Sequence, residues 1–179
     1  MKELTILLAG SGRGHIHYHC ETWTVNDTYK YAKRVDKHFL FHKQIYRLFD
    51  NEPVFNWKEM NKLPCVITTH EIAELKNREP YPLNEIISLL ETDFLGHSGA
   101  YLLAYACYLK VTDNAYDQIY LDNWYFQASG ENSATDGRFV EYWIGYAKGL
   151  GIKIWLPPQS WLCKTWHSVP YAMAYETQV

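Results

Sequence analysis

Short apolar runs alternate with longer segments of helical period along this chain. The first run, Leu4 to Ala9 (LTILLA), stops at a glycine-rich segment, which is the pattern of a buried parallel strand. β-Branched and aromatic residues predict five further strands. These strands are expected at Glu21 to Asn26, Lys37 to His42, Pro64 to His70, Tyr116 to Trp124 and Ile152 to Pro157.

Three segments carry apolar residues at helical spacing. A helix is expected within Tyr81 to Glu91, because its apolar residues recur every three or four positions. The segment His97 to Val111 predicts a second helix with small alanines suited to close packing on a sheet, and Arg138 to Gly151 a third that ends at a glycine. A short helix is also expected at Gln44 to Asp50, and the polar stretch Gly130 to Gly137 is interpreted as a loop.

This alternation of strands and helices predicts an α/β fold. A length of 179 residues suits one domain, so we expect residues 1–179 to form a single domain. Its sheet should be mostly parallel, with about six strands and helices on both faces.

The charge pattern argues against two classes of partner. The chain has 17 basic and 20 acidic residues, a net charge of -3, and no run of five like charges. A nucleic-acid or anionic-membrane surface normally concentrates basic charge, so we expect neither partner. No apolar stretch reaches the roughly 18 residues of a membrane span, and Met1 to Leu8 lacks the features of a signal peptide. These patterns predict a cytoplasmic protein whose partner is a small molecule or another protein.

Cysteines and aromatic residues add two observations. Four cysteines are scattered without a CxxC pair, which indicates reduced thiols and not a disulfide framework or zinc ribbon. Fifteen tyrosines and seven tryptophans suit a surface that stacks on a flat ligand or joins two copies in a homodimer. A core of aromatic rings with hydrogen-bonded tips explains the same composition, and both interpretations stay open here.

The glycine-rich turn after the first strand is the first candidate site. Backbone N–H groups at Gly10, Ser11 and Gly12 can approach an anion closely, and Arg13 can clamp a phosphate with two hydrogen bonds. Ser98 and Gly99 begin the predicted second helix and can present N–H groups to another anionic group. The alternative is that the glycines only allow a tight turn and that Ser98 only caps its helix.

The remaining candidate residues follow the other predicted strands. In an open parallel sheet, ligands bind beyond the carboxyl ends of the strands, at a topological switch point. Those ends carry Asn26, Asp27, His42, His70, Asp122 and Asn123. Asp122 is the favoured carboxylate, because a short acid at a strand end can bind a sugar hydroxyl or a metal ion. Asn26 and Asp27 could bind ribose or a base edge, or simply form a turn.

Two further patterns carry competing interpretations. Arg138 and Glu141 are three residues apart on a predicted helix, so they either point into the same cleft or form a surface ion pair. His15, His17 and His19 alternate, which would align three imidazoles on one face of an extended segment. No acidic partner has ligand spacing, so we expect no metal site there. The catalytic residues are not identified by any of these patterns.

The order of these motifs resembles that of a group of phage-borne and bacterial Rossmann-like proteins. That group is related to the 6-hydroxymethylpterin diphosphokinase-like and motility-accessory glycosyltransferase families. The resemblance rests on short matching motifs: Gly10-Ser11-Gly12, Val25-Asn26, Ser98-Gly99 and Asp122. It implies a Rossmann-like fold over most of residues 4–160. Gly12-Arg13-Gly14-His15 stands where the family has its GPS continuation, so the fold is expected more firmly than transferase chemistry.

Three functions are compatible with these observations. The preferred hypothesis is binding of a nucleotide or nucleotide-derived molecule at the carboxyl edge of the sheet, for example by a phage-encoded anti-defence protein that sequesters a nucleotide immune signal in the host cytoplasm. The second is a glycosyl- or diphospho-transferase with a nucleotide donor, for which Asp122 would hold Mg²⁺. The third is an inhibitor that binds a protein through its aromatic surface and takes no ligand.

Overall fold

A computed structural model describes residues 1–8, 19–41, 55–124, 126 and 131–163 of the chain. These residues form seven strands, four α-helices and one 3₁₀ helix, η1. The strands are β1 (Glu3–Leu7), β2 (Glu21–Val25), β3 (Lys37–Leu40), β4 (Val66–Thr68), β5 (Arg78–Pro80), β6 (Gln118–Asp122) and β7 (Lys153–Trp155). The helices are η1 (Thr28–Lys30), α1 (Trp57–Met60), α2 (Leu83–Leu90), α3 (Ser98–Asp113) and α4 (Glu131–Gly149).

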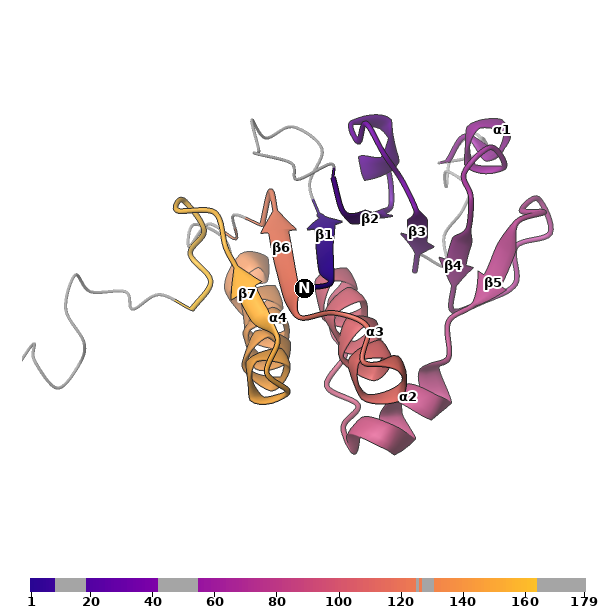
Figure 1. Ribbon diagram of the computed structural model, residues 1–179. Coiled ribbons are helices and arrows are strands. Elements are labelled where there is room, and N and C mark those ends of the chain that lie inside the picture. Colours follow the sequence, from indigo (N-terminus) through magenta and orange to yellow (C-terminus); the bar gives the residue numbers. More distant parts are fainter. Residues whose placement is uncertain (9–18, 42–54, 125, 127–130, 164–179) are drawn as a thin grey trace, which may run out of the picture.

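All seven described strands form one parallel sheet in the order β5-β4-β3-β2-β1-β6-β7 (Figure 1). The chain starts in the middle of the sheet, winds outward to β5, and returns to the other side of β1 with β6 and β7. The order therefore reverses between β1 and β6, and this pair is the topological switch point.

The helices lie on both faces of the sheet, as expected for a sheet wound in two directions. Helices α2, α3 and α4, which follow β5, pack together on one face, whereas η1 and α1 belong to the cluster on the other face (Figure 1). Right-handed crossovers explain this division, because strands added in opposite directions from β1 need their connections on opposite faces. The α/β, Rossmann-like fold with a mostly parallel sheet is thus confirmed.

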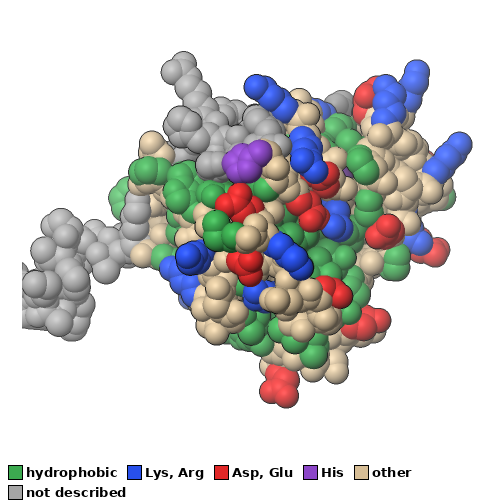
Figure 2. Space-filling view, in the orientation of Figure 1, with side chains coloured by type: hydrophobic (Ala, Val, Ile, Leu, Met, Phe, Trp, Pro, Cys, Tyr) green, Lys and Arg blue, Asp and Glu red, His purple; other side chains and the backbone are tan. Residues whose placement is uncertain are grey.

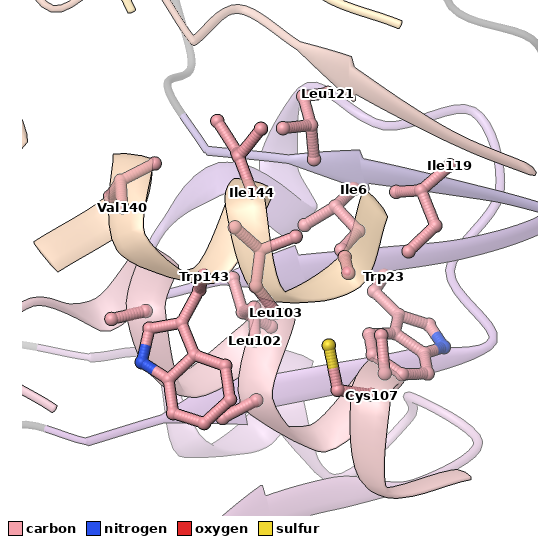
Figure 3. Packing of buried hydrophobic residues seen from close by; sticks show 14 of the residues in the cluster. Ile6, Trp23, Leu102, Leu103, Cys107, Ile119, Leu121, Val140, Trp143 and Ile144 are labelled. Atoms are coloured by element: carbon pink, nitrogen blue, oxygen red, sulfur yellow. The ribbon is translucent and has the colours of Figure 1, made fainter. Parts of the chain in front are cut away.

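The main core lies between the sheet and helices α3 and α4. Ile6, Trp23 and Leu121 project from three strands toward Leu103 of α3 and Trp143 of α4 (Figure 3). All five side chains are fully buried. The Trp143 indole also donates a hydrogen bond from Nε1 to the Phe94 carbonyl at 2.8 Å, so its polar atom is satisfied inside the core.

Many of the aromatic residues belong to this core and not to a separate surface. Trp23 packs against Phe39, Tyr105 and Tyr116, with ring centroids 5.1, 5.4 and 5.6 Å apart. The hydroxyl of Tyr116 and the indole of Trp23 both donate to the Glu21 carboxylate, each at 2.8 Å, and Lys37 completes this group. The core with hydrogen-bonded tips therefore accounts for these rings.

Three details of the structure were not predicted from the sequence. The described sheet has seven strands where about six were expected, and the additional one is the three-residue edge strand β5. Helix α4 begins at Glu131, so most of the stretch interpreted as a loop is helical. Helix α1 lies in a segment with no predicted element, and the helix expected at Gln44 to Asp50 lies outside the described residues.

The described helices and the face in Figure 2 bear on two expected absences, membrane spans and a basic surface. No helix in the described part of the chain is long and apolar enough to cross a bilayer. On the face seen in Figure 2, basic and acidic side chains are interspersed over the described surface. This face therefore lacks the concentrated positive charge of a nucleic-acid-binding surface.

Candidate functional site at the carboxyl edge of the sheet

The carboxyl ends of β1 and β6 lie side by side at the switch point. Leu7 and Asp122 are paired in the parallel register, and the Leu8 N–H donates to the Asp122 carbonyl at 3.3 Å. Asp122 is 1% exposed, and Asn123 after it is 4% exposed. Asn123 has a φ of 59°, in the left-handed region that asparagine tolerates better than most residues, so the chain turns sharply at this edge. The favoured carboxylate therefore stands beside the end of the central strand.

The turn after β2 lies on the other side of β1. Asn26 has a φ of 57° and donates its N–H to the Phe39 carbonyl of β3 at 3.0 Å. The Thr28 hydroxyl lies 2.8 Å from the Val25 carbonyl and 3.3 Å from the Leu7 carbonyl, which ties this turn to the end of β1. The side-chain oxygen of Asn26 is buried and has no hydrogen-bond partner within the described ranges. A buried acceptor of this kind normally bonds water or a ligand donor.

The residue after Asn26 has a different environment. Asp27 is exposed and precedes η1, where its side chain makes no capping hydrogen bond. Its carbonyl accepts the Lys30 N–H at 3.2 Å, so its backbone contributes to the turn. The turn-forming interpretation therefore describes what Asp27 does in this structure, and a ligand contact by its carboxylate stays a prediction.

His38 of β3 contacts the last residues of β2. It is fully buried in β3, and its Nδ1 lies 2.8 Å from the Thr24 hydroxyl of β2. The Tyr29 ring of η1 packs edge-on against the imidazole, with centroids 5.1 Å apart. Burial lowers the pKa of His38 to about 3, so the ring is neutral at physiological pH. This histidine therefore links β3 to β2 and has no exposure to solvent.

The N-terminus of α3 reaches the same edge. A Cβ added to Gly99 would lie 2.9 Å from Cζ3 of Trp124, so only glycine allows the helix to approach this ring without movement. The Trp124 indole donates from Nε1 to the Ile6 carbonyl of β1 at 3.0 Å. Trp124 thus joins the start of α3 to the end of β1, two residues beyond Asp122.

The helix cap differs from the sequence expectation. The N-cap of α3 is His97, and Ser98 is the first helical residue. The Gly99 N–H donates to His97 Nδ1 at 3.0 Å, and the Ala100 N–H donates to the His97 carbonyl at 2.9 Å. Two of the amide donors at this helix start are therefore occupied within the chain, which leaves less for an anion than the sequence suggested.

The other predicted residues lie farther from the switch point. His70 follows β4, and its carbonyl accepts a hydrogen bond from the Thr68 hydroxyl at 2.6 Å. Strands β2 and β3 separate β4 from β1. On α4, the Glu141 carboxylate accepts the Cys163 N–H at 2.7 Å. Within the described part of the chain no ion pair joins Arg138 to Glu141, so the surface-pair interpretation of these two residues is not what the structure contains.

Some predicted residues cannot be placed. The residues Gly10, Ser11, Gly12, Arg13, His15, His17 and His42 lie outside the described residues. His19 is described, and its Nε2 lies 3.1 Å from the Glu3 carboxylate. Among residues 1–8, 19–41, 55–124, 126 and 131–163, no group of three His, Cys, Asp or Glu side chains is arranged to hold a metal ion.

Comparisons with known proteins identify a solved structure with a similar fold. No family model and no curated protein sequence matches the chain. A solved structure that does match is a variant of the α-2,3/8-sialyltransferase CstII, with a TM-score of 0.56 and 16% sequence identity. The match covers 98% of this chain and 99% of that chain. The fold is therefore similar to that of a glycosyltransferase, in agreement with the Rossmann-like part of the sequence resemblance, and at this identity the likeness extends to the fold alone.

Proposed function

We propose that this chain binds a nucleotide-type small molecule at the carboxyl edge of its sheet, over the switch point between β1 and β6. The position of Asp122 carries the proposal, because its carboxyl group belongs to the strand end beside β1, where open parallel sheets bind ligands. On the other side of β1, the Asn26 side-chain oxygen, which has no hydrogen-bond partner among the described residues, supplies an acceptor for a ribose hydroxyl or a base amino group.

In this proposal, Asp122 and Asn26 bind the sugar and base, and the loop from Gly10 to Arg13 binds the phosphates. A ribose hydroxyl donates well to a carboxylate, because a hydrogen bond to a charged group is stronger than a neutral one. Glycine amides and an arginine are suited to phosphate oxygens.

A thermal-shift screen tests the proposal. The panel contains nucleotides, cyclic nucleotides and nucleotide sugars, each with and without Mg²⁺. A ligand that binds only the folded chain raises the melting temperature by mass action. We expect at least one compound to raise it and Asp122→Asn to reduce that rise. The matched control is Asp117→Asn, at the opposite end of β6, which should leave the ligand-induced rise unchanged. Absence of any shift across the panel would favour a protein-binding inhibitor instead.

A second candidate function is transfer of a glycosyl or diphosphate group from a nucleotide donor. The likeness of the fold to a sialyltransferase favours it. Mass analysis of the released compound after incubation separates the two candidates. Recovery of the unchanged nucleotide indicates binding or sequestration, whereas a new product formed with Mg²⁺ indicates transfer, with Asp122 as the proposed ligand of the ion.

A further inference from the structure

The start of α3 lies against α4 close to the switch point. Gly96, just before α3, lies against α4 so closely that an added Cβ would come within 2.2 to 2.5 Å of the Phe139 ring. Asp136 is three residues before Phe139 on α4, so the two side chains share one side of that helix. His97 follows Gly96, and the Asp136 carboxylate is near enough to act electrostatically on its imidazole.

The hydrogen bond at the cap fixes the tautomer of His97. A backbone N–H can only donate, so the Nδ1 that receives the Gly99 N–H at 3.0 Å must be unprotonated. In a neutral imidazole the proton then resides on Nε2, which makes Nε2 a hydrogen-bond donor. Among the described residues, the cap bond to Gly99 is the only hydrogen bond that the His97 side chain makes, and we take its Nε2 as the donor to a ligand.

The surroundings keep this donor neutral. Burial lowers the pKa of His97, and the Asp136 carboxylate opposes this only in part. The positive end of the α3 dipole also disfavours an imidazolium. Phe126 packs edge-on against the imidazole, with ring centroids 5.2 Å apart, and lies about 4.0 Å from a Cβ added to Gly137 beside Asp136. An uncharged donor, a carboxylate acceptor and an aromatic ring therefore occupy one region.

We propose that His97 and Asp136 bind a hydroxyl group of a sugar attached to the nucleotide, with His97 donating through Nε2 and Asp136 accepting the hydroxyl proton. A hydroxyl is both donor and acceptor, so it satisfies both side chains at once. A phosphate group fits less well, because it would lie against the Asp136 carboxylate, and the Gly99 and Ala100 amides are already bonded. This inference rests on the proposed nucleotide site and assigns the substrate class to nucleotide sugars.

Two substitutions distinguish the role of His97 Nε2 as a donor to a ligand from the role of Nδ1 in capping α3. His97→Asn places an amide oxygen near the Nδ1 position and keeps the helix cap, since asparagine is a preferred N-cap residue, but it removes the Nε2 donor. His97→Gln places an amide N–H group near the Nε2 position and weakens the cap. A merely structural histidine would be replaced better by asparagine, whereas a ligand donor would be replaced better by glutamine.

The experiment compares affinities for UDP, UDP-glucose, CMP and CMP-sialic acid, measured by calorimetry on the full chain. We expect one nucleotide sugar to bind more tightly than its nucleotide. This advantage should fall about threefold to tenfold in His97→Asn, the range for one neutral hydrogen bond, and be partly restored in His97→Gln. Affinity for the nucleotide alone should stay unchanged in both variants.

Three results would overturn the inference. If the wild type bound a nucleotide and its nucleotide sugar with equal affinity, the inferred sugar site would be disproved, whereas the proposed nucleotide site would still stand. Equal weakening of both ligands by His97→Asn would assign His97 to the phosphate or to folding. A long-range ¹H–¹⁵N NMR spectrum of the ligand-free protein that showed a proton on His97 Nδ1 would contradict the assigned tautomer, in which the proton is on Nε2. If wild type bound none of the four compounds or any other nucleotide, the proposed function itself would fail.

Discussion

The buried His38 should make the folded chain sensitive to mild acid. Its ring is fully buried and its pKa is lowered to about 3 by burial, whereas an unfolded histidine has a pKa of about 6.5. Below pH 6.5 the unfolded chain therefore binds a proton that the folded chain does not, and the free energy of unfolding falls as the pH falls. Between pH 7 and pH 5 this linkage costs about 2 kcal/mol, and it levels off at about 5 kcal/mol below pH 3.

Urea denaturation at pH 7, 6 and 5 measures this effect. The matched variant is His38→Asn. Its side-chain amide can take the place of Nδ1 beside the Thr24 hydroxyl, but it does not bind a proton between pH 5 and pH 7. We expect the wild type to lose about 2 kcal/mol more than the variant between pH 7 and pH 5. NMR titration of the folded wild type should show no protonation of His38 above pH 5. Equal pH slopes for the two proteins, or a His38 pKa near 6.5 in the folded chain, would refute the burial argument.

The remaining predictions concern packing and hydrogen bonds, each read from urea unfolding. Gly96→Ala should cost about 1–3 kcal/mol, because its Cβ would overlap the Phe139 ring, and Phe139→Leu in the same chain should recover part of the loss. Gly145→Ala, on the same helix as Phe139, should instead add about 0.5–1 kcal/mol to the free energy of unfolding, because no described residue beyond the adjacent helix backbone lies within 4 Å of the new Cβ. A loss of stability there would contradict the packing account. Trp124→Phe should cost about 1–3 kcal/mol, because the Ile6 carbonyl of β1 loses the hydrogen bond from the indole. An unchanged stability would mean that this hydrogen bond contributes nothing. Burial alone would raise the pKa of Glu21, but its three donors lower it below the ordinary glutamate value. Glu21→Gln should therefore cost about 1 kcal/mol at pH 7 and progressively less as the pH falls below that ordinary value, and a pH-independent cost would contradict this.

Strand and helix periodicity predicted most of the fold, because buried strands and amphipathic helices leave a direct pattern in the chain. Strand β5 was missed because Arg78–Pro80 is three residues long, exposed in part and ends in proline, which is rare inside strands. The first turns of α4 were missed because Asn, Ser, Thr, Asp and Gly have weak helix propensity, and the packing of α4 against α3 overrides that preference.

The candidate site was predicted in part. The strand-end rule correctly located Asp122 and Asn26 at the carboxyl edge, since parallel strands bring their ends to one side of the sheet. The role of His97 was missed because serine is the more common N-cap, and the sequence offers Ser98 one position later. Asp136 was hidden in a segment interpreted as a loop. Its proximity to His97 depends on how α4 packs beside α3, which one sequence does not reveal.

The most direct test of the account is an amide chemical-shift map of the wild-type chain titrated with the best nucleotide from the thermal-shift panel. The account predicts that the largest shifts fall at the carboxyl edge, on Leu8, Asn26 and Asn123, while Glu21 and Asp117 at the opposite edge barely move. Shifts centred on the amino-terminal edge, or spread evenly over the chain, would contradict ligand binding at the β1–β6 switch point.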